Sequence, residues 1–377
     1  MKLAIQTLLT RGPVDEAAID KFLRAHSFPL VEGRHATFVY RGPADAVNLR
    51  HWVFGLPSSQ AFHRVPGTSF WYHVMELPPQ SRVEYKLEVV HGEKSQWIRD
   101  PQNPNLAHDP FGANSVCAGQ GYQRPGWTEP DPEARPGTMV DAVLDGTPLG
   151  TRPVTIYLPA RFRESRRYPL LIVHDGGDYL RYAALKTVLD NLIHRLEVAP
   201  VIAALTHPGD RLTEYPNNPA HAAFLTEHLL PFMEKRYPLY EAPGARCLMG
   251  ASFGGVASLS TAWRYPGTFG RLLLQSGSFA FTDIGESKRG PAFAPVVEFV
   301  NAFREKPGKP SDKVYVSCGT FESLIYENRS MVPFLQSTGM DVKYEEARDG
   351  HNWENWRDRL RGGLSWLFPG PLWMVYE

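Results

Sequence analysis

The feature that most constrains the fold of this chain is a short apolar run that ends in a serine flanked by glycines. Residues 247–250 read CLMG, and the serine is Ser252 in the motif Gly250-Ala-Ser252-Phe-Gly254, which a helical run follows. A strand, G-x-S-x-G and a helix in direct succession are typical of the nucleophile elbow, a strained turn that presents a serine hydroxyl above the end of a sheet. Glycines let the neighbouring backbone approach closely. The motif therefore predicts an α/β-hydrolase fold in which Ser252 is the nucleophile.

The chain after residue 135 alternates continuous apolar runs with helical runs. This alternation favours a mostly parallel sheet with helices on both faces. The predicted strands are 154–158, 170–174, 201–205, 247–250, 271–275, 314–318 and 342–347, and the predicted helices are 180–196, 220–235 and 255–264.

The chain before residue 135 has a different pattern. A helical run at 14–25 precedes four runs of alternating, β-rich sequence at 36–41, 47–54, 70–77 and 83–90, and residues 125–136 (PGWTEPDPEARP) read as a linker. A chain of 377 residues also exceeds the usual size of one domain. We expect two domains: 1–135, an N-terminal helix with a small immunoglobulin-like β-sandwich, and 136–377, the α/β-hydrolase catalytic domain.

Composition limits the partners. Lys plus Arg and Asp plus Glu both number 40, so no overall charge favours nucleic acid or an anionic membrane. The three cysteines are scattered without metal-ligand spacing, and the first residues hold too short an apolar run for a secretory signal. We expect a cytoplasmic protein with no metal, no cofactor, no nucleic-acid or membrane partner and a small-molecule substrate.

A serine nucleophile needs a base, which in this fold lies after it in the chain. His351 is the only histidine after Ser252, and it directly follows the predicted strand 342–347. The chain order therefore predicts that His351 is the general base.

The acid that orients the histidine has two candidates. Glu322 lies just past the predicted strand 314–318, at the strand end where this fold presents its acid, whereas Asp349 lies only two residues before His351. Asp312 precedes its strand and is at the wrong end. Glu322 is our prediction, with Asp349 as the alternative.

Acyl transfer also needs donors for the oxyanion. The first predicted donor is the amide of Phe253, the residue after the nucleophile. The second is the amide of Gly176 or Gly177, in the sequence HDGGDY at 174–179.

With these residues in place, the chain resembles the enterochelin esterase family, within the esterase D group of α/β-hydrolases. The resemblance is carried by 154–159 (VTIYLP), 174–177 (HDGG), 211–215 (RLTEY), the elbow, 318–322 (CGTFE) and 349–357 (DGHNWENWR), and, before them, by 67–71 (GTSFW) and 100–104 (DPQNP). It implies an N-terminal sandwich similar to the early-set modules of glycogen-active enzymes. It also implies hydrolysis of catecholate siderophore trilactones in the cytoplasm, or, as in relatives, of acyl groups on carbohydrates.

A ferric catecholate is negatively charged, so its binding residues should include cations. Candidates are Arg211, Arg181, Lys288, Arg289 and Arg329. The alternative for Arg211 is a simple pairing with Glu214. Tyr179 and Trp353 are further candidates for substrate contact, although tryptophans three residues apart, such as Trp353 and Trp356, are more often core.

Two other functions stay open. An acyl-carbohydrate esterase is favoured by the sandwich's likeness to sugar-binding modules and by its aromatic residues Trp52, Phe70, Trp71 and Tyr72. The third hypothesis is a non-catalytic binding protein on a hydrolase scaffold, which the intact elbow and base argue against. The oligomeric state is left open.

Overall fold

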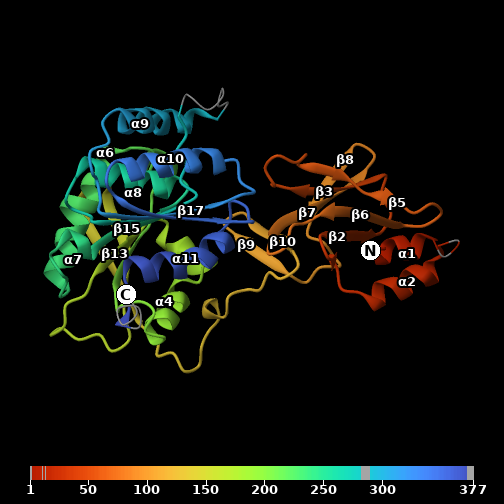
Figure 1. Cartoon of the computed structure of the whole chain (residues 1–377), viewed down its shortest axis with the longest axis horizontal. Coiled ribbons are helices and arrows are strands. Elements are labelled where there is room, and N and C mark those ends of the chain that lie inside the picture. Colours follow the sequence, from red (N-terminus) through yellow and green to blue (C-terminus); the bar gives the residue numbers. More distant parts are fainter. Residues whose placement is uncertain (1, 11, 13, 282–288, 372–377) are drawn as a thin grey trace. The chain divides into compact units, whose positions relative to one another are not determined.

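The computed structural model describes residues 2–10, 12, 14–281 and 289–371. The chain divides into two compact units. The first unit contains the chain up to residue 123 together with two later segments, 319–322 and 347–352, and the second unit contains the remainder (Figure 1). None of the helices in the described ranges is long and apolar enough to cross a membrane.

The first unit is built on two antiparallel sheets. One has the strand order β1-β2-β6-β5, and the other has the order β4-β3-β7-β10-β9, with β8 paired to β7. The strands are β1 (Leu30–Glu32), β2 (His35–Arg41), β3 (Ala46–His51), β4 (Ser59–Ala61), β5 (His63–Arg64), β6 (Phe70–Glu76), β7 (Arg82–His91), β8 (Lys94–Ile98), β9 (Leu106–Asp109) and β10 (Gly112–Ala118).

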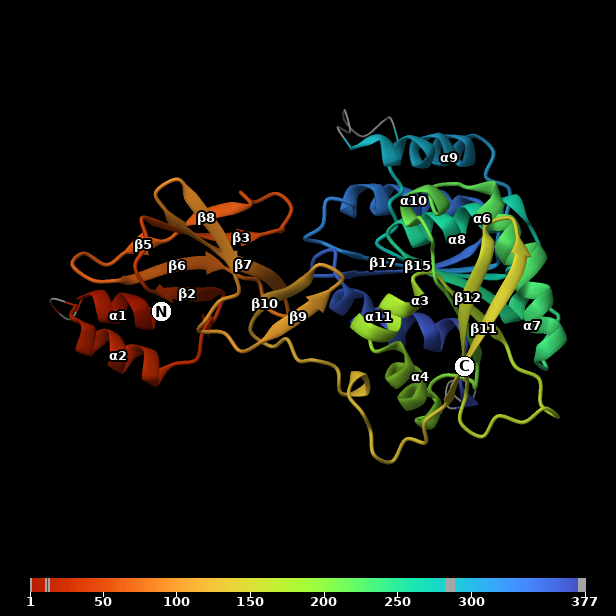
Figure 2. The ribbon, with the colours of Figure 1, turned by 180° about the vertical axis from the view of Figure 1, so that it is seen from behind.

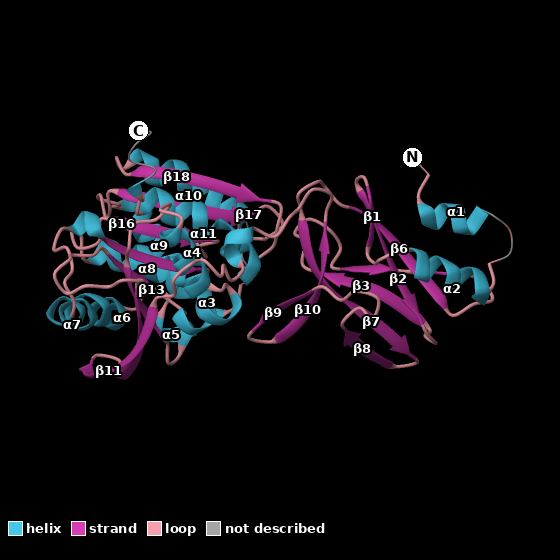
Figure 3. Ribbon diagram, turned by 90° about the horizontal axis from the view of Figure 1, so that it is seen from below, coloured by secondary structure: helices cyan, strands magenta, loops and turns pink. Residues whose placement is uncertain are grey.

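Side-chain alternation along β2 explains how its sheet is covered on both faces. Phe38 packs into a core with residues of β3 and β7, such as Leu49, and the next residue, Val39, packs into a second core with Ile19 and Phe22. The latter two belong to α2 (Glu16–Ala25), which lies beside β2 and β6 together with α1 (Ala4–Thr10) (Figure 3). The predicted β-sandwich is therefore present, with one helix more than the sequence indicated.

The second unit is an eight-stranded sheet with the order β11-β12-β14-β13-β15-β16-β17-β18. The pairs from β14 through β13, β15 and β16 to β17 are parallel, whereas β11 and β12 are antiparallel and lie at one edge (Figure 2). The strands are β11 (Thr138–Thr147), β12 (Gly150–Leu158), β13 (Leu170–Val173), β14 (Ile202–Thr206), β15 (Arg246–Ala251), β16 (Arg271–Gln275), β17 (Lys313–Gly319) and β18 (Asp341–Ala347).

Helices cover both faces of this sheet and close two cores. Residues of α8, α9 and α10 pack in one core, and residues of α3, α4 and α11 pack in the other (Figure 1). The helices are α3 (Gly176–Tyr182), α4 (Leu185–His194), α5 (Arg211–Glu214), α6 (Pro219–Ala223), α7 (Leu230–Arg236), α8 (Phe253–Arg264), α9 (Ala294–Glu305), α10 (Ile325–Ser337) and α11 (Trp353–Leu367). This arrangement confirms the predicted α/β-hydrolase fold class.

Two predicted helices differ in detail. The predicted helix 180–196 is broken into α3 and α4, because Ala184 adopts a left-handed conformation with φ 49°. The predicted helix 220–235 contains a π-helical segment, Phe224–Leu229, between α6 and α7. Pro231, two residues after the π-helical segment, has no N–H to donate and is a local sign of that irregularity, whereas the break at Ala184 has no glycine or proline to mark it.

Candidate active site

Ser252 stands at the sharp turn between β15 and α8. Its backbone has φ 56° and ψ −120°, and its amide donates to the carbonyl of Gln275 on β16 at 2.9 Å. Positive φ is costly for a residue with a Cβ, and such strain persists where the surrounding structure enforces it, often at functional sites. The local geometry is that of a nucleophile elbow.

The glycines of the motif are required by close backbone packing. A Cβ on Gly250 would lie 2.4 Å from the carbonyl carbon and oxygen of Gly254, at the start of α8. A Cβ on Gly254 would lie 3.2 Å from the Cβ of His174. The crossing of β15 and α8 at Ser252 therefore requires glycine at position 250, and Gly254 lets α8 lie close to His174, the residue after β13.

The predicted oxyanion donors lie at the beginnings of two helices. Phe253 is the first residue of α8 and Gly176 is the first residue of α3. The first amides of a helix have no intrahelical acceptor, so they can donate to a bound anion. Because β13 and β15 are adjacent and parallel, both helices begin at the same edge of the sheet. A Cβ on Gly176 would lie 2.4 Å from Leu205 Cβ, which explains the glycine there.

His351 and Glu322 form a hydrogen-bonded pair within the first unit. The Nδ1 atom of His351 lies 2.7 Å from Oε2 of Glu322. The Glu322 side chain is buried, and its Oε1 accepts a hydrogen bond from the amide of Gly319 at 2.5 Å. A buried carboxylate hydrogen-bonded to one ring nitrogen fixes the tautomer and the orientation of an imidazole.

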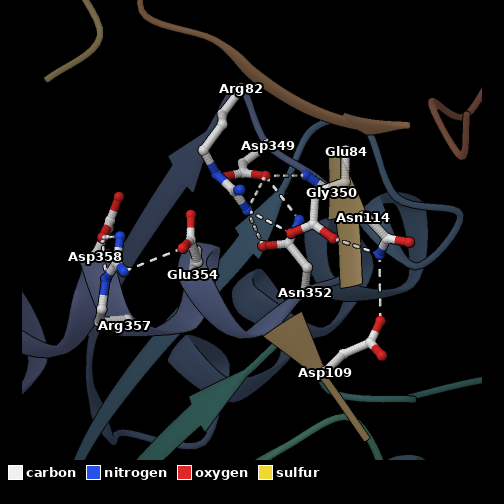
Figure 4. Close-up of polar contacts among 10 residues, drawn as sticks. All are labelled: Arg82, Glu84, Asp109, Asn114, Asp349, Gly350, Asn352, Glu354, Arg357 and Asp358. Carbon is white, nitrogen blue, oxygen red and sulfur yellow. Dashed lines mark hydrogen bonds and ion pairs between the residues drawn. The ribbon is translucent and has the colours of Figure 1, made fainter. Parts of the chain in front are cut away.

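Asp349, the alternative acid, is engaged elsewhere. Its carboxylate accepts from Nε of Arg82 at 2.9 Å, from the backbone amide of Gly350 at 2.7 Å and from the side-chain Nδ2 of Asn352 at 2.8 Å (Figure 4). Burial raises the pKa of Asp349 to about 6, although Arg82 acts in the opposite direction. The geometry thus favours Glu322 over Asp349 as the partner of the histidine.

Arg211 braces the elbow, but through a different carboxylate from the one expected. Its Nε and Nη2 atoms donate to both oxygens of Asp175 at 2.9 to 3.0 Å, and Nη2 lies 3.4 Å from the carbonyl of Ala251. Glu214 instead pairs with Arg152. The pairing of Arg211 with Glu214 is therefore wrong, because the left-handed turn at Asp175 brings that carboxylate to the arginine. About one third of the Arg211 side chain stays exposed.

Tyr179 and Trp353 lie in the core of the second unit. Tyr179 is fully buried, and its hydroxyl donates to the side chain of Gln275 at 2.8 Å. Trp353 is also buried, with its ring edge-on to the rings of Tyr179 and Trp356. The backbone carbonyl of the same glutamine, Gln275, accepts a hydrogen bond from the Ser252 amide. These buried aromatic rings therefore support the elbow from within the core and do not present a surface to a ligand.

The other basic candidates differ in their surroundings. Arg289 pairs with Glu327, and Arg329 pairs with Glu346. Arg181 is exposed and lies over the ring of Tyr182. Lys288 lies outside the described residues.

A buried histidine pair next to the elbow had no sequence signal beyond the HDGG motif. The Nε2 atoms of His174 and His221 lie 3.0 Å apart, and Nδ1 of His174 contacts the carbonyl of Met249 and the hydroxyl of Ser258 at 3.0 and 3.1 Å. Both rings are buried, and burial lowers the pKa of His174 to about 4. Among the described residues no group of three or more His, Cys, Asp or Glu side chains is placed to hold a metal ion.

Comparison with known proteins gives matches over both units. A model of the Esterase family matches residues 148–367. The iron(III) enterobactin esterase of Dickeya dadantii (strain 3937) is 24% identical, over 97% of this chain and 96% of its own. A crystal structure of the enterobactin esterase from Shigella flexneri in the presence of enterobactin has a TM-score of 0.72 and 21% identity, covering 91% of this chain and 94% of that one.

A structure of a ferulic acid esterase gives a more limited match. It has a TM-score of 0.53 and 20% identity, and it covers 62% of this chain and 98% of that one. The matches confirm the resemblance that the sequence motifs predicted, and the likeness to the enterobactin esterases extends through the N-terminal β-rich region.

Proposed function

The chain belongs to the Esterase family, and we propose that it hydrolyses the ester bonds of a catecholate siderophore through an acyl-enzyme on Ser252. The observation that carries the substrate class is the match to an iron(III) enterobactin esterase along nearly the full length of both chains. A carboxylic-ester hydrolase is what the family match supports, and the strained serine between β15 and α8 supports the acyl-enzyme route.

In the proposed mechanism, Ser252 Oγ attacks the ester carbonyl while Nε2 of His351 takes the hydroxyl proton. Glu322, bonded to Nδ1, stabilises the resulting imidazolium. The negative oxygen of the tetrahedral intermediate accepts from the amide of Phe253 and from that of Gly176 or Gly177. The intermediate collapses as the C–O bond breaks and His351 returns the proton to the leaving alkoxide. Water then releases the acid by the same steps.

In this proposal, arginine side chains that are exposed or partly exposed bind the negatively charged substrate. Arg211 remains a candidate because about one third of its side chain is exposed despite its pairing with Asp175. Tyr179 and Trp353 are no longer candidates for direct contact, since both are buried. Iron enters only as part of the substrate, and a cytoplasmic site of reaction remains part of the proposal.

A fluorophosphonate probe tests the chemistry directly. The native protein should be labelled on Ser252, and Ser252→Ala should abolish the labelling. His351→Ala should lower kcat on a simple aryl ester by about 10⁴-fold. A native protein that the probe leaves unlabelled would instead support the binding-protein hypothesis.

The substrate class is tested with enterobactin, both iron-free and ferric, and mass-spectrometric analysis of the products. Release of 2,3-dihydroxybenzoyl-serine units is the expected result. If the trilactone stays intact while an aryl ester is cleaved rapidly, the assignment of a siderophore substrate is wrong.

The second candidate, an acyl-carbohydrate esterase, is favoured by the likeness of the fold over 62% of this chain to a ferulic acid esterase. The sandwich aromatics support this function less well than the sequence suggests, because Phe70 and Trp71 are buried and, of the four, only Trp52 is largely exposed. Feruloylated and acetylated oligosaccharides in the same assay separate the two functions.

A further inference from the structure

The loop that carries His351 is fastened to the sandwich by a buried arginine. Arg82 begins β7, and its side chain is 1% exposed. Its Nε donates to Asp349 Oδ2 at 2.9 Å, its Nη2 lies 3.4 Å from Oδ1, and Nη2 also bonds the side-chain oxygen of Asn352 (Figure 4). The Arg82 amide donates to the carbonyl of Arg348 at 2.9 Å. Arg82 therefore contacts three residues of the loop: Arg348 and Asp349, which precede His351 in the sequence, and Asn352, which follows it.

We propose that Arg82 is a positioning residue for His351: by clamping Asp349 and Asn352, it fixes the loop so that the imidazole stands in a productive orientation. This inference rests on the proposed role of His351 as base. It assigns the sandwich a part in forming the catalytic machinery, beyond any part in substrate recognition.

The loop that carries Glu322 is tied to the same anchor. The amide of Phe321 donates to the carbonyl of Asp349 at 3.1 Å, and the amide of Thr320 donates to the carbonyl of Ala347 at 2.7 Å. From the sandwich, the amide of Phe54 donates to the carbonyl of Phe321 at 2.7 Å. The backbone of Asp349 thus binds the loop that carries Glu322, and the side chain of Asp349 binds Arg82. A shift of Asp349 would therefore displace both members of the His351–Glu322 pair.

The arginine is itself fixed from the sandwich side. Its Nη2 donates to Glu84 Oε1 at 2.9 Å, and Asn114 donates to the other oxygen of Glu84 at 2.9 Å (Figure 4). Neighbouring strands β7 and β10 therefore set the position of the guanidinium. Only arginine offers a planar fork that can reach the carboxylate of Asp349 and the amide of Asn352 together, which a lysine cannot reproduce.

The test uses the full chain, an aryl ester such as p-nitrophenyl butyrate and active-site titration with a fluorophosphonate. Arg82→Met should lower kcat by about 100-fold, the loss expected when a catalytic group is displaced by about 1 Å. KM should change by less than about two-fold and the final labelling stoichiometry should stay at the native value, because the acyl site itself is untouched. Arg82→Lys should fall between native protein and Arg82→Met.

Arg50→Met is the matched control. Arg50 also lies in the sandwich, on β3, where its guanidinium pairs with Glu88 and lies over the ring of Trp97. Its removal should leave kcat unchanged. Equal kcat losses in Arg50→Met and Arg82→Met would mean general destabilisation and would overturn the proposal.

A double-mutant cycle covers the case in which Arg82→Met does not fold. Asp349→Asn and Arg82→Lys should each lower kcat at native labelling stoichiometry, and combining them should cost no more than the worse single change. Native kcat in both single variants, or fully additive losses, would contradict the clamp. Fluorophosphonate labelling of His351→Ala is measured in parallel. If this variant is labelled as fast as native protein, the assignment of His351 as base fails. If it is labelled slowly while the Arg82 variants keep native rates, only the clamp is rejected.

Discussion

At the scale of single residues, the buried pair His174 and His221 should make the protein sensitive to acid. Burial lowers the pKa of His174 from its ordinary 6.5 to about 4, and it lowers the pKa of His221 as well. Unfolding releases both rings to water, so the unfolded chain binds more protons below pH 6.5. The unfolding free energy therefore keeps its full value above pH 6.5 and decreases as the pH falls towards 4. For His174 the decrease is on the order of 3 kcal/mol.

The substitution His221→Phe tests this linkage. The variant should lose less unfolding free energy than the native protein between pH 7 and pH 4.5, because one proton fewer is taken up on unfolding. Urea denaturation at both values measures the difference. His91→Phe, at an exposed position, should keep the native loss, and an undiminished loss in His221→Phe would contradict the assignment.

At the scale of elements, the crossing of β15 over the start of α8 depends on Gly250. An added Cβ would lie 2.4 Å from Gly254 backbone atoms, so Gly250→Ala must push the helix away from the strand. We expect a cost of about 1–3 kcal/mol in unfolding free energy and slower fluorophosphonate labelling of Ser252, since the helix also carries the Phe253 amide. Chemical denaturation and labelling kinetics provide the two measurements.

Gly244→Ala is the control at this scale. An added Cβ there meets nothing within 4 Å, so the change should stay within about 0.5 kcal/mol. Similar stability of the two variants would show that the elbow can relax more than its close contacts suggest.

The elements also show what the sequence could predict. Central strands such as β13 and β14 are continuous apolar runs buried on both faces, and this pattern alone reveals them. The edge strand β11 has five exposed residues of ten and no such run, so the apolar pattern does not reveal it. Chain order and strand ends are enough to nominate Ser252, His351 and Glu322 as candidates from the sequence, and these three remain predictions. Arg82 could not be nominated in this way, because its partner Asp349 is 267 positions away and no local pattern marks a buried ion pair.

At the scale of the whole molecule, the two units are not consecutive pieces of chain. The segments 319–322 and 347–352 continue from β17 and β18 but belong to the first unit. A division by composition could not foresee this, since two loops of four and six residues carry no compositional signal. If the sheet of the second unit unfolds, these loops lose their anchored ends. We therefore expect the two units to unfold together.

The three cysteines can report this coupling. Cys117 lies on β10 of the first unit, Cys247 on β15 and Cys318 on β17, and all three are buried thiols outside any disulfide. Burial raises the pKa of Cys117 to about 12 and also raises that of Cys247, so little reactive thiolate forms in the folded protein. Native protein should be inert to Ellman's reagent for minutes, and all three thiols should react in strong denaturant.

Pulsed alkylation along a urea series, read by mass spectrometry, then compares the units. Coupled unfolding predicts that Cys117 and Cys247 become reactive at the same urea concentration, because each unit depends on chain that the other anchors. Arg82→Met should separate the two transitions, with Cys117 reacting first, since it removes the side-chain clamp on the 347–352 loop. Reaction of Cys117 well before Cys247 in the native protein would instead show that the sandwich unfolds without the sheet, and the loops would then contribute little to its stability.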